Sequence, residues 1–351
     1  MSDIQLRKRS HIDICTHRDV TFKKSTLLEE VDLIHCALPE LDTSYISLNT
    51  SVAGRAIAAP FIIGAMTGGT GDGNHFNAIL AEVAETHRIA LCLGSMRPAL
   101  MDSAVVPEFD VKKLAPNVPV FTNIGANQLN AFDADHILEL ATRISDGLFV
   151  HLNAGMELIQ PRGDTGFFGQ VEALAALVDA AGPFPIVVKE TGMGLSLRDG
   201  ALLRQAGVRT VETAGAGGTS WIGVETERAT GINRQVGKML WDFGIPTAAS
   251  IAWMHRCGFE TIGSGGVYTA LDAARAIRLG ASAVAMARPW LLAYQQGKMD
   301  GLNALAEELM TGLRYVMVCT GAKTIVDLQQ VDCIIGDRLM KYINHSAEMD
   351  L

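Results

Sequence analysis

Eight short apolar, β-branched runs recur along the chain, and amphipathic stretches separate most of them. Strands that alternate with helices predict a parallel sheet, and strands that are apolar on both faces predict that the sheet is covered on both sides. Eight repeats favour a closed (β/α)8 TIM barrel, with an open doubly wound sheet as the alternative. The predicted strands are Phe61–Ala65, Ile89–Leu93, Pro119–Asn123, Gly147–Leu152, Pro185–Glu190, Val208–Thr213, Glu260–Ser264 and Ser282–Ala287. The predicted helices include Asn77–Thr86, Ala134–Ser145, Val171–Ala181, Ser196–Gln205 and Leu271–Leu279.

The remaining segments predict additions to one barrel rather than a second domain. The chain has 351 residues, of which 48% are hydrophobic, so residues 1–351 can form a single barrel domain with insertions. Residues 1–60 do not follow the strand–helix rhythm, and we expect an N-terminal extension that covers the mouth of the barrel or packs at its base. Residues 219–244 are long for a barrel loop and suggest a lid loop. The apolar stripe of Asn303–Thr320 predicts a C-terminal helix.

The charge and the cysteines narrow the class of protein. The formal net charge is −9 and the isoelectric point is about 5.5, which argues against general binding to nucleic acid or to an anionic membrane. The six cysteines form no C-x-x-C pair, so we expect reduced thiols in a cytoplasmic protein. No secretory signal is evident, and the longest apolar run, Ala56–Met66, is too short to cross a bilayer.

A glycine-rich turn predicts a phosphate site. Ile262-Gly263-Ser264-Gly265-Gly266 ends the seventh predicted strand, and the eighth ends at Ala287-Arg288-Pro289. In (β/α)8 barrels, the loops after these two strands commonly bind phosphate. Glycines let backbone N–H groups approach the anion closely, and a helix N-terminus adds partial positive charge. We therefore expect a phosphorylated ligand or cofactor here.

Polar residues follow six of the predicted strands, at the end where barrel enzymes carry their chemistry. These segments are Gly64–Gly69, Gly94–Arg97, Thr122-Asn123, His151–Asp164, Lys189-Glu190 and Glu212–Ser220. Each also has a structural interpretation. Lys189 could be an ion-pair partner of a barrel carboxylate, and His151 could be a satisfied core histidine. Six such ends in order nevertheless favour a small-molecule active site.

At these residues the chain resembles the type II, FMN-dependent isopentenyl diphosphate isomerase family. The basic N-terminal motif combined with the motif after the fourth strand carries the specificity. The matching segments run in family order over nearly the whole chain: Arg7-Lys8-x-x-His11, Met66-Thr-Gly-Gly69, Gly94-Ser-x-Arg97, His151-Leu-Asn153, Glu157, Gln160-Pro161, Gly163-Asp164, Val188-Lys-Glu190, Ala214–Trp221, Gly244–Ala248 and Gly263–Gly266.

The resemblance implies isomerisation of isopentenyl diphosphate to dimethylallyl diphosphate in isoprenoid biosynthesis, with reduced FMN, Mg²⁺ and NADPH as the flavin reductant. It also implies a homo-tetramer or homo-octamer. The implied catalytic positions are His151 and Met156, and the implied metal ligand is Glu157. The implied substrate-binding residues are Arg7, Lys8, His11, Ser95, Arg97, His151 and Asn153. The implied FMN-binding residues are Ala65, Met66, Thr67, Ser95, Asn123, Lys189, Thr219, Gly265, Gly266, Ala287 and Arg288.

The chain departs from the family at Met156, where the family has glutamine. A thioether cannot donate a hydrogen bond, so the departure bears directly on the reaction. It leaves open a related barrel enzyme that acts on another prenyl-type diphosphate. A flavin oxidoreductase of the 2-hydroxy-acid oxidase kind is a further alternative, but it would need an arginine and a histidine that Gly215–Ser220 lacks. A barrel that binds FMN or a prenyl diphosphate without turnover is the third.

Overall fold

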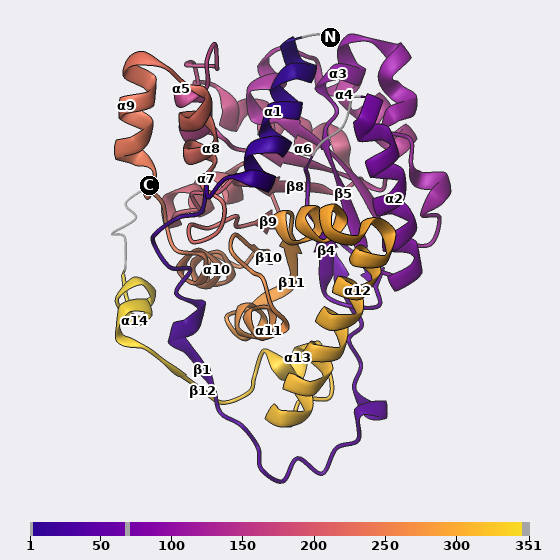
Figure 1. The fold of residues 1–351 in the computed structure, drawn as a ribbon, viewed down its shortest axis with the longest axis vertical. Helices are drawn as coiled ribbons and strands as arrows, with labels where there is room; N and C mark the ends of the chain where they lie inside the picture. The colour runs from indigo at the N-terminus through magenta and orange to yellow at the C-terminus, as the bar shows by residue number, and fades with distance from the viewer. Residues whose placement is uncertain (1–2, 67–70, 346–351) are drawn as a thin grey trace.

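Eight parallel strands close into a barrel in the computed structural model, which describes residues 3–66 and 71–345 (Figure 1). The strands follow one another in chain order, and pairing of Val284 with Phe61 joins the last to the first. This confirms the predicted (β/α)8 barrel and excludes the open sheet. The barrel strands are β4 (Phe61–Ile63), β5 (Ala90–Ser95), β6 (Val120–Gly125), β7 (Gly147–His151), β8 (Ile186–Lys189), β9 (Thr210–Glu212), β10 (Glu260–Ser264) and β11 (Ala281–Met286).

Helices surround the barrel, and several begin where the sequence supplies a capping residue. Ser196 and Asp199 form a reciprocal capping box at the start of α7, as the predicted boundary at Ser196 anticipates. The α-helices are α1 (Asp3–His17), α2 (Gly71–His87), α3 (Arg97–Met101), α4 (Ala134–Ile144), α5 (Ala154–Ile159), α6 (Gln170–Ala181), α7 (Leu197–Gln205), α8 (Trp221–Arg228), α9 (Gly231–Leu240), α10 (Thr247–Arg256), α11 (Ala270–Arg278), α12 (Arg288–Thr320, with a kink at Lys298), α13 (Ile325–Leu328) and α14 (Asp337–Ile343). Short 3₁₀ helices span Leu28–Glu30, Thr43–Tyr45, Ser103–Glu108, Lys112–Leu114 and Ala126–Asn130.

The N-terminal extension contributes to both ends of the barrel. Helix α1 lies beside the upper part of the barrel (Figure 1), while the hairpin of β2 (Thr50–Val52) and β3 (Arg55–Ile57) packs at the base. Val52 and Ile57 belong to the same buried cluster as barrel residues such as Phe121. The backbone N–H of Ala53 donates to Glu260 Oε1 at 2.8 Å, which fixes the tip of the hairpin. Different parts of the extension therefore lie at the two ends of the barrel, and its role as a cover for the mouth stays a prediction.

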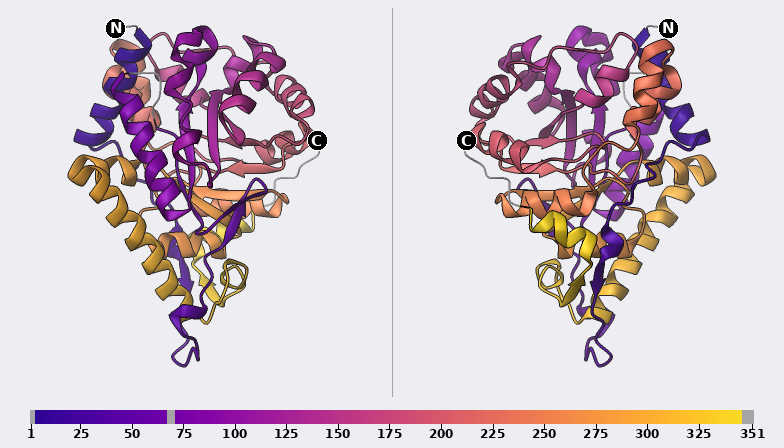
Figure 2. Two further views of the ribbon diagram at one scale, coloured as in Figure 1. Left: turned by 90° about the vertical axis from the view of Figure 1, so that its right-hand side faces the viewer. Right: turned by 90° about the vertical axis from the view of Figure 1, so that its left-hand side faces the viewer.

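The rest of the extension joins the C-terminal helices. Strand β1 (Val31–Leu33) pairs antiparallel with β12 (Cys333–Ile335), and the molecule narrows toward this end (Figure 2). The main hydrophobic core lies between the barrel and its helices and continues into these additions. The chain is thus one barrel with attached segments.

Residues 219–244 fold into helices α8 and α9 and not into an open loop. Helix α8 begins where the Ser220 hydroxyl accepts a hydrogen bond from the N–H of Gly223. Its residues Ile222 and Val224 are buried, and the charged residues that follow them in the helix obscured this pattern. Closure of this segment as a lid stays a prediction.

Candidate active site

A central hollow opens at the carboxyl ends of the barrel strands and holds about 1030 Å³ of empty space, part of it open to solvent. Two basic residues of α1, Lys8 and His11, form one wall. Of the residues expected to bind a cofactor, Ala65, Met66, Lys189, Thr219, Gly265, Gly266, Ala287 and Arg288 also line it. Ser95 and Asn123 are not among its lining residues, and Thr67 lies outside the described residues.

Two glycine-rich turns meet backbone to backbone beside this hollow. Gly265 has a φ of +98°, and a Cβ there would lie 2.1 Å from the carbonyl oxygen of Gly215. A Cβ on Gly218 would lie 2.3 Å from the nitrogen of Gly266. Only glycine fits such contacts, and the turns can therefore present their backbone to a ligand. Helix α12 begins nearby at Arg288, so the region suits a phosphate.

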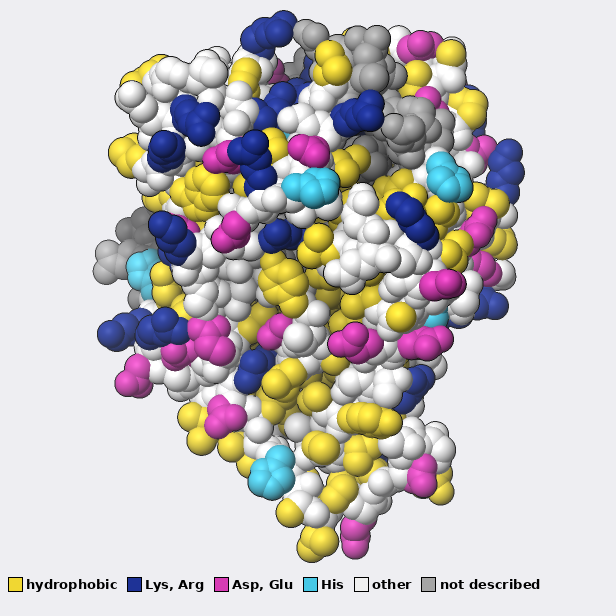
Figure 3. Space-filling model, in the orientation of Figure 1, with side chains coloured by type: hydrophobic (Ala, Val, Ile, Leu, Met, Phe, Trp, Pro, Cys, Tyr) yellow, Lys and Arg dark blue, Asp and Glu magenta, His cyan; other side chains and the backbone are white. Residues whose placement is uncertain are grey.

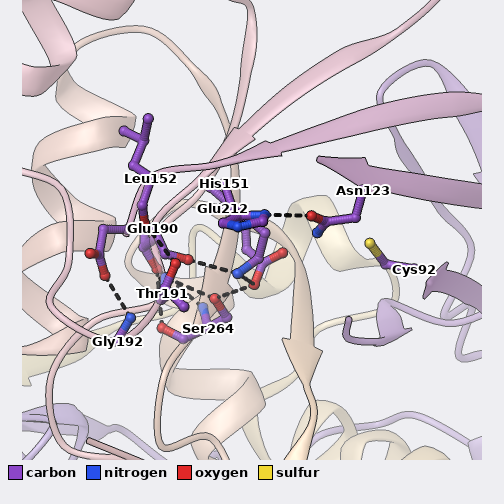
Figure 4. Close-up of polar contacts among 12 residues, drawn as sticks. Cys92, Asn123, His151, Leu152, Glu190, Thr191, Gly192, Glu212 and Ser264 are labelled. Carbon is purple, nitrogen blue, oxygen red and sulfur yellow. Dashed lines mark hydrogen bonds and ion pairs between the residues drawn. The ribbon is translucent and has the colours of Figure 1, made fainter. Parts of the chain in front are cut away.

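The ends of three neighbouring strands carry a polar network (Figure 4). Lys189 Nζ donates to the carbonyl oxygen of Glu190 at 2.7 Å and lies 3.7 Å from Glu212 Oε1. The hydroxyl of Ser264 donates to the same carboxylate oxygen at 2.8 Å. Lys189, Glu212 and Ser264 all line the central hollow. The lysine is therefore an ion-pair partner of a barrel carboxylate and also lines the hollow, and its contact with an anionic ligand stays a prediction.

Glu190 shapes the turn that follows β8. Its Oε2 accepts hydrogen bonds from the N–H groups of Gly192 at 2.6 Å, of Met193, and of Gly194 at 3.1 Å. Burial raises the pKa of Glu190 to about 7, and the backbone donors oppose that rise. The turn held in this way presents Thr191 and Gly192 to the hollow.

His151 ends β7 and lies inside the barrel. Its Nδ1 lies 2.6 Å from Asn123 Oδ1, across adjacent strands (Figure 4). Burial lowers the pKa of His151 to about 3, and the nearby charge of Lys189 adds to the effect. The structure thus supports the satisfied core histidine and leaves a part in catalysis as a prediction.

A second, basic hollow lies beside the central one, because Arg228 Nη1 in its wall is 3.3 Å from His11 Nε2 in the wall of the central hollow. Arg7, Arg97, Arg162 and Arg228 line it together with Leu6, Glu157, Gln160, Pro161 and Asp164. Arg97 Nε is buried and has no hydrogen-bond partner among the described residues. A space-filling view shows Lys and Arg side chains over the part of the surface where α1, α5 and α8 lie (Figure 3). Guanidinium groups gathered in this way suit a polyanionic ligand.

Glu157 is fixed in the basic hollow by hydrogen bonds to both of its side-chain oxygens. Its Oε1 accepts from Asn153 Nδ2 at 2.8 Å, and its Oε2 accepts from Gln160 Nε2 at 2.9 Å and from the N–H of Asp164 at 3.0 Å. Glu157 lies in the first turn of α5, one turn after Asn153, so the short helix positions both groups. Within the described residues, no group of three or more acidic, histidine or cysteine side chains is placed to hold a metal ion. A metal at Glu157 would need further oxygen ligands from its substrate.

The surroundings of Arg7 and Lys8 in α1 lower the pKa of both side chains. Burial and the neighbouring Arg7 lower the pKa of Lys8 to about 8. Burial also lowers the pKa of Arg7, while Glu157 opposes this. A bound anion would relieve both effects, because it favours the charged form of each side chain.

Glu225 and Arg228 of α8 belong to the site, and neither is among the residues expected from the sequence. Glu225 is completely buried, with Oε1 at 2.6 Å from His11 Nε2 and Oε2 at 2.5 Å from Arg228 Nη1. The ring of His11 also packs edge-on against Trp221, with centroids 5.2 Å apart. The network links the central hollow, lined by His11, to the basic hollow, lined by Arg228. A spacing of three residues between Glu225 and Arg228 was the available signal, once α8 is known to be a helix.

Two predicted residues have surroundings that the sequence did not indicate. Arg288 lines the central hollow, but its Nε donates to the carbonyl oxygen of Cys15 at 3.1 Å, so it also anchors the end of α1. Met156 lies in α5, half-buried, and is among the lining residues of neither hollow.

Comparison with known proteins agrees with this geometry. A sequence model of the FMN-dependent dehydrogenase family matches residues 170–334. Among solved structures, a flavocytochrome b2 variant superposes with a TM-score of 0.66 at 17% identity, over 98% of this chain and 86% of that chain. A mandelate oxidase variant with an FMN adduct gives a TM-score of 0.64 at 18% identity, over 93% of this chain and 92% of that chain. At such low identity, these two structures establish the fold alone.

Closer relatives are found by sequence. The isopentenyl-diphosphate delta-isomerase of Methanosarcina barkeri is 36% identical over 98% of this chain and 95% of its own length. The isopentenyl-diphosphate delta-isomerase of a Synechococcus species is 40% identical over 91% of this chain and 93% of its own length. That of Pelodictyon phaeoclathratiforme is also 40% identical, over 92% and 95% respectively.

The closed barrel, the glycine-rich cradle and the family match together define an FMN-dependent barrel enzyme. Within that class, the chain belongs to the isopentenyl-diphosphate delta-isomerase family. This confirms the resemblance carried by the motifs. No helix among the described residues is long and apolar enough to cross a membrane.

Proposed function

We propose that this protein converts isopentenyl diphosphate to dimethylallyl diphosphate with reduced FMN, Mg²⁺ and NADPH as the flavin reductant. The observation that carries the proposal is the junction of the two hollows. The basic hollow contains Arg97, whose buried Nε has no hydrogen-bond partner among the described residues. It lies beside the central hollow, which contains the glycine-rich turns. One hollow suits a diphosphate and the other suits a flavin.

The residues of the central hollow fit FMN. The backbone of Gly265 and Gly266, with the start of α12, would hold the phosphate, and Lys189 would lie against the rest of the cofactor. Reduced flavin, when bound, can give and take a proton at its ring, which is the chemistry that an alkene isomerisation needs. The protein would supply orientation and exclusion of water around that step.

The residues of the basic hollow fit a diphosphate with one divalent cation. Its residues Arg7, Arg97 and Arg228 would neutralise the phosphate oxygens, together with Lys8 from the neighbouring wall of the central hollow. Glu157 would supply the single protein carboxylate that Mg²⁺ needs when the phosphates and waters complete its shell. The Glu225 carboxylate would keep His11 and Arg228 in place between the two hollows.

Met156 supports a second candidate, the same barrel acting on another prenyl-type diphosphate. A thioether offers no proton and no donor where the family has an amide. The family resemblance also supports a homo-tetramer or homo-octamer and a cytoplasmic location, and we include both in the proposal.

The decisive experiment follows the reaction by NMR. Purified protein, FMN, NADPH, Mg²⁺ and isopentenyl diphosphate are mixed anaerobically in deuterated water, with a Met156→Gln variant alongside. Dimethylallyl diphosphate from the native chain would support the proposal. Product from the variant alone would favour the second candidate, and the search would move to other allylic diphosphates. An absence of product from both, with FMN bound, would refute the isomerase proposal.

A further inference from the structure

One carboxylate oxygen beside the central hollow accepts no hydrogen bond from the residues that the structure describes. The side chain of Glu212 is 5% exposed, and its Oε2 accepts no hydrogen bond from the described residues. In the part of the chain that the structure describes, Glu212 Oε2 is the only buried side-chain atom without a hydrogen-bond partner that belongs to a residue lining the central hollow. Burying a carboxylate oxygen without a donor is unfavourable, so a molecule in the hollow is the physical source of one.

The other oxygen of Glu212 has a hydrogen-bond donor and a lysine beside it, and these contacts hold the carboxylate in place. Oε1 accepts the hydroxyl proton of Ser264 at 2.8 Å and lies 3.7 Å from Lys189 Nζ. The Ser264 hydroxyl cannot turn elsewhere without loss, because its oxygen accepts the N–H of Ala214 at 2.8 Å. Glu212 is therefore held as an acceptor, and its Oε2 is the part left for a ligand (Figure 4).

The position of Glu212 in the barrel indicates which part of a flavin nucleotide it meets. Glu212 ends β9 and pairs with β10, where Ser264 directly precedes the Gly265-Gly266 turn. A carboxylate repels phosphate, so the phosphate itself is not its partner. The part of FMN that adjoins the phosphate is the ribityl chain, whose hydroxyl groups are hydrogen-bond donors.

We propose that Glu212 is an FMN-binding residue whose Oε2 accepts a hydrogen bond from a ribityl hydroxyl. The inference rests on FMN being the cofactor, as in the proposed function. The bond joins a neutral donor to a charged acceptor in a buried place, where such bonds are strong. Through Oε1, the same carboxylate also keeps Lys189 directed into the hollow.

The first test measures FMN affinity and not turnover. The flavin is removed, and FMN is titrated back into the native chain and into Glu212→Gln while the quenching of flavin fluorescence is followed. We expect the variant to bind FMN about tenfold or more weakly, the effect of losing one hydrogen bond to a charged group. The matched control is Glu260→Gln, which alters a barrel carboxylate at the base, where it bonds to Thr210 and Ala53. The control should bind FMN as the native chain does.

The second test removes the donor instead of the acceptor. FMN analogues that each lack one ribityl hydroxyl are titrated into the native chain and into Glu212→Gln. We expect one analogue to bind the native chain about tenfold more weakly than FMN, and that difference to vanish in the variant. This series also decides the matter on the native chain alone if the variant does not fold.

Three results separate the outcomes. Binding of FMN by Glu212→Gln within about twofold of the native value overturns the inference and leaves water as the donor to Oε2. Equal binding of all the analogues by the native chain overturns it as well. Failure of the native chain to bind FMN at all would instead refute the proposed function.

Discussion

Replacement of Glu225 by alanine tests whether the buried network holds α1 on the barrel. The carboxylate is completely buried and meets His11 Nε2 at 2.6 Å and Arg228 Nη1 at 2.5 Å. Burial lowers the pKa of His11, while the hydrogen bond to Glu225 opposes this. Removing one member of a buried charged network leaves its partners unpaired, which typically costs about 3–5 kcal/mol. We expect the free energy of unfolding of Glu225→Ala to fall by about that amount.

Glu227 provides a matched control on the same helix. It pairs with Arg18 at 2.5 Å, but the Arg18 side chain is 59% exposed. Solvent screens such a surface pair, so Glu227→Ala should cost less than about 1 kcal/mol. Urea unfolding followed by tryptophan fluorescence gives both values by linear extrapolation. Limited proteolysis of α1 should be faster in Glu225→Ala if the helix detaches before the barrel unfolds.

The result that would refute this reasoning is equality of the two variants. If Glu225→Ala matches Glu227→Ala in unfolding free energy and in the rate at which α1 is cleaved, the buried network does not hold the helix. Packing of Ile14 and the hydrogen bond from Arg288 to Cys15 would then be sufficient.

Three further predictions concern the two hollows. Glu157→Gln should weaken the Mg²⁺ dependence of diphosphate binding and leave FMN bound; calorimetric titration with and without Mg²⁺ measures this, and an unchanged dependence would remove Glu157 as the metal ligand. The pKa of Lys8 is lowered to about 8, so Lys8 loses its charge as the pH rises through that value, and the KM for the diphosphate should increase at pH values above about 8. A pH profile of Lys8→Arg should lack that increase, because arginine keeps its charge. Gly265→Ala should abolish FMN binding, because its Cβ would lie 2.1 Å from the Gly215 carbonyl oxygen at a φ of +98°; near-native flavin affinity of a folded variant would show that the cradle is not where the cofactor binds.

The sequence by itself determined the barrel and the end at which its polar residues gather. Each apolar run, such as Phe61–Ala65, overlaps a strand, because burial on both faces leaves a local hydrophobic pattern. The turn at Gly265 and Gly266 was equally predictable from the sequence, since few other residues permit such a backbone conformation. Parallel strands in chain order then bring their polar ends together without further information.

Only the tertiary structure decided which of those polar groups meet. His11 and Glu225 are 214 residues apart, and nothing in the local pattern of either predicts their contact. The unpartnered oxygen of Glu212 likewise exists only because Ser264 and Lys189 converge on the other oxygen. Hydrophobic periodicity records which face of an element is buried, whereas the partners of a buried charge depend on how distant elements pack. The fold could therefore be read from the chain, while the network that links the two hollows required the structure.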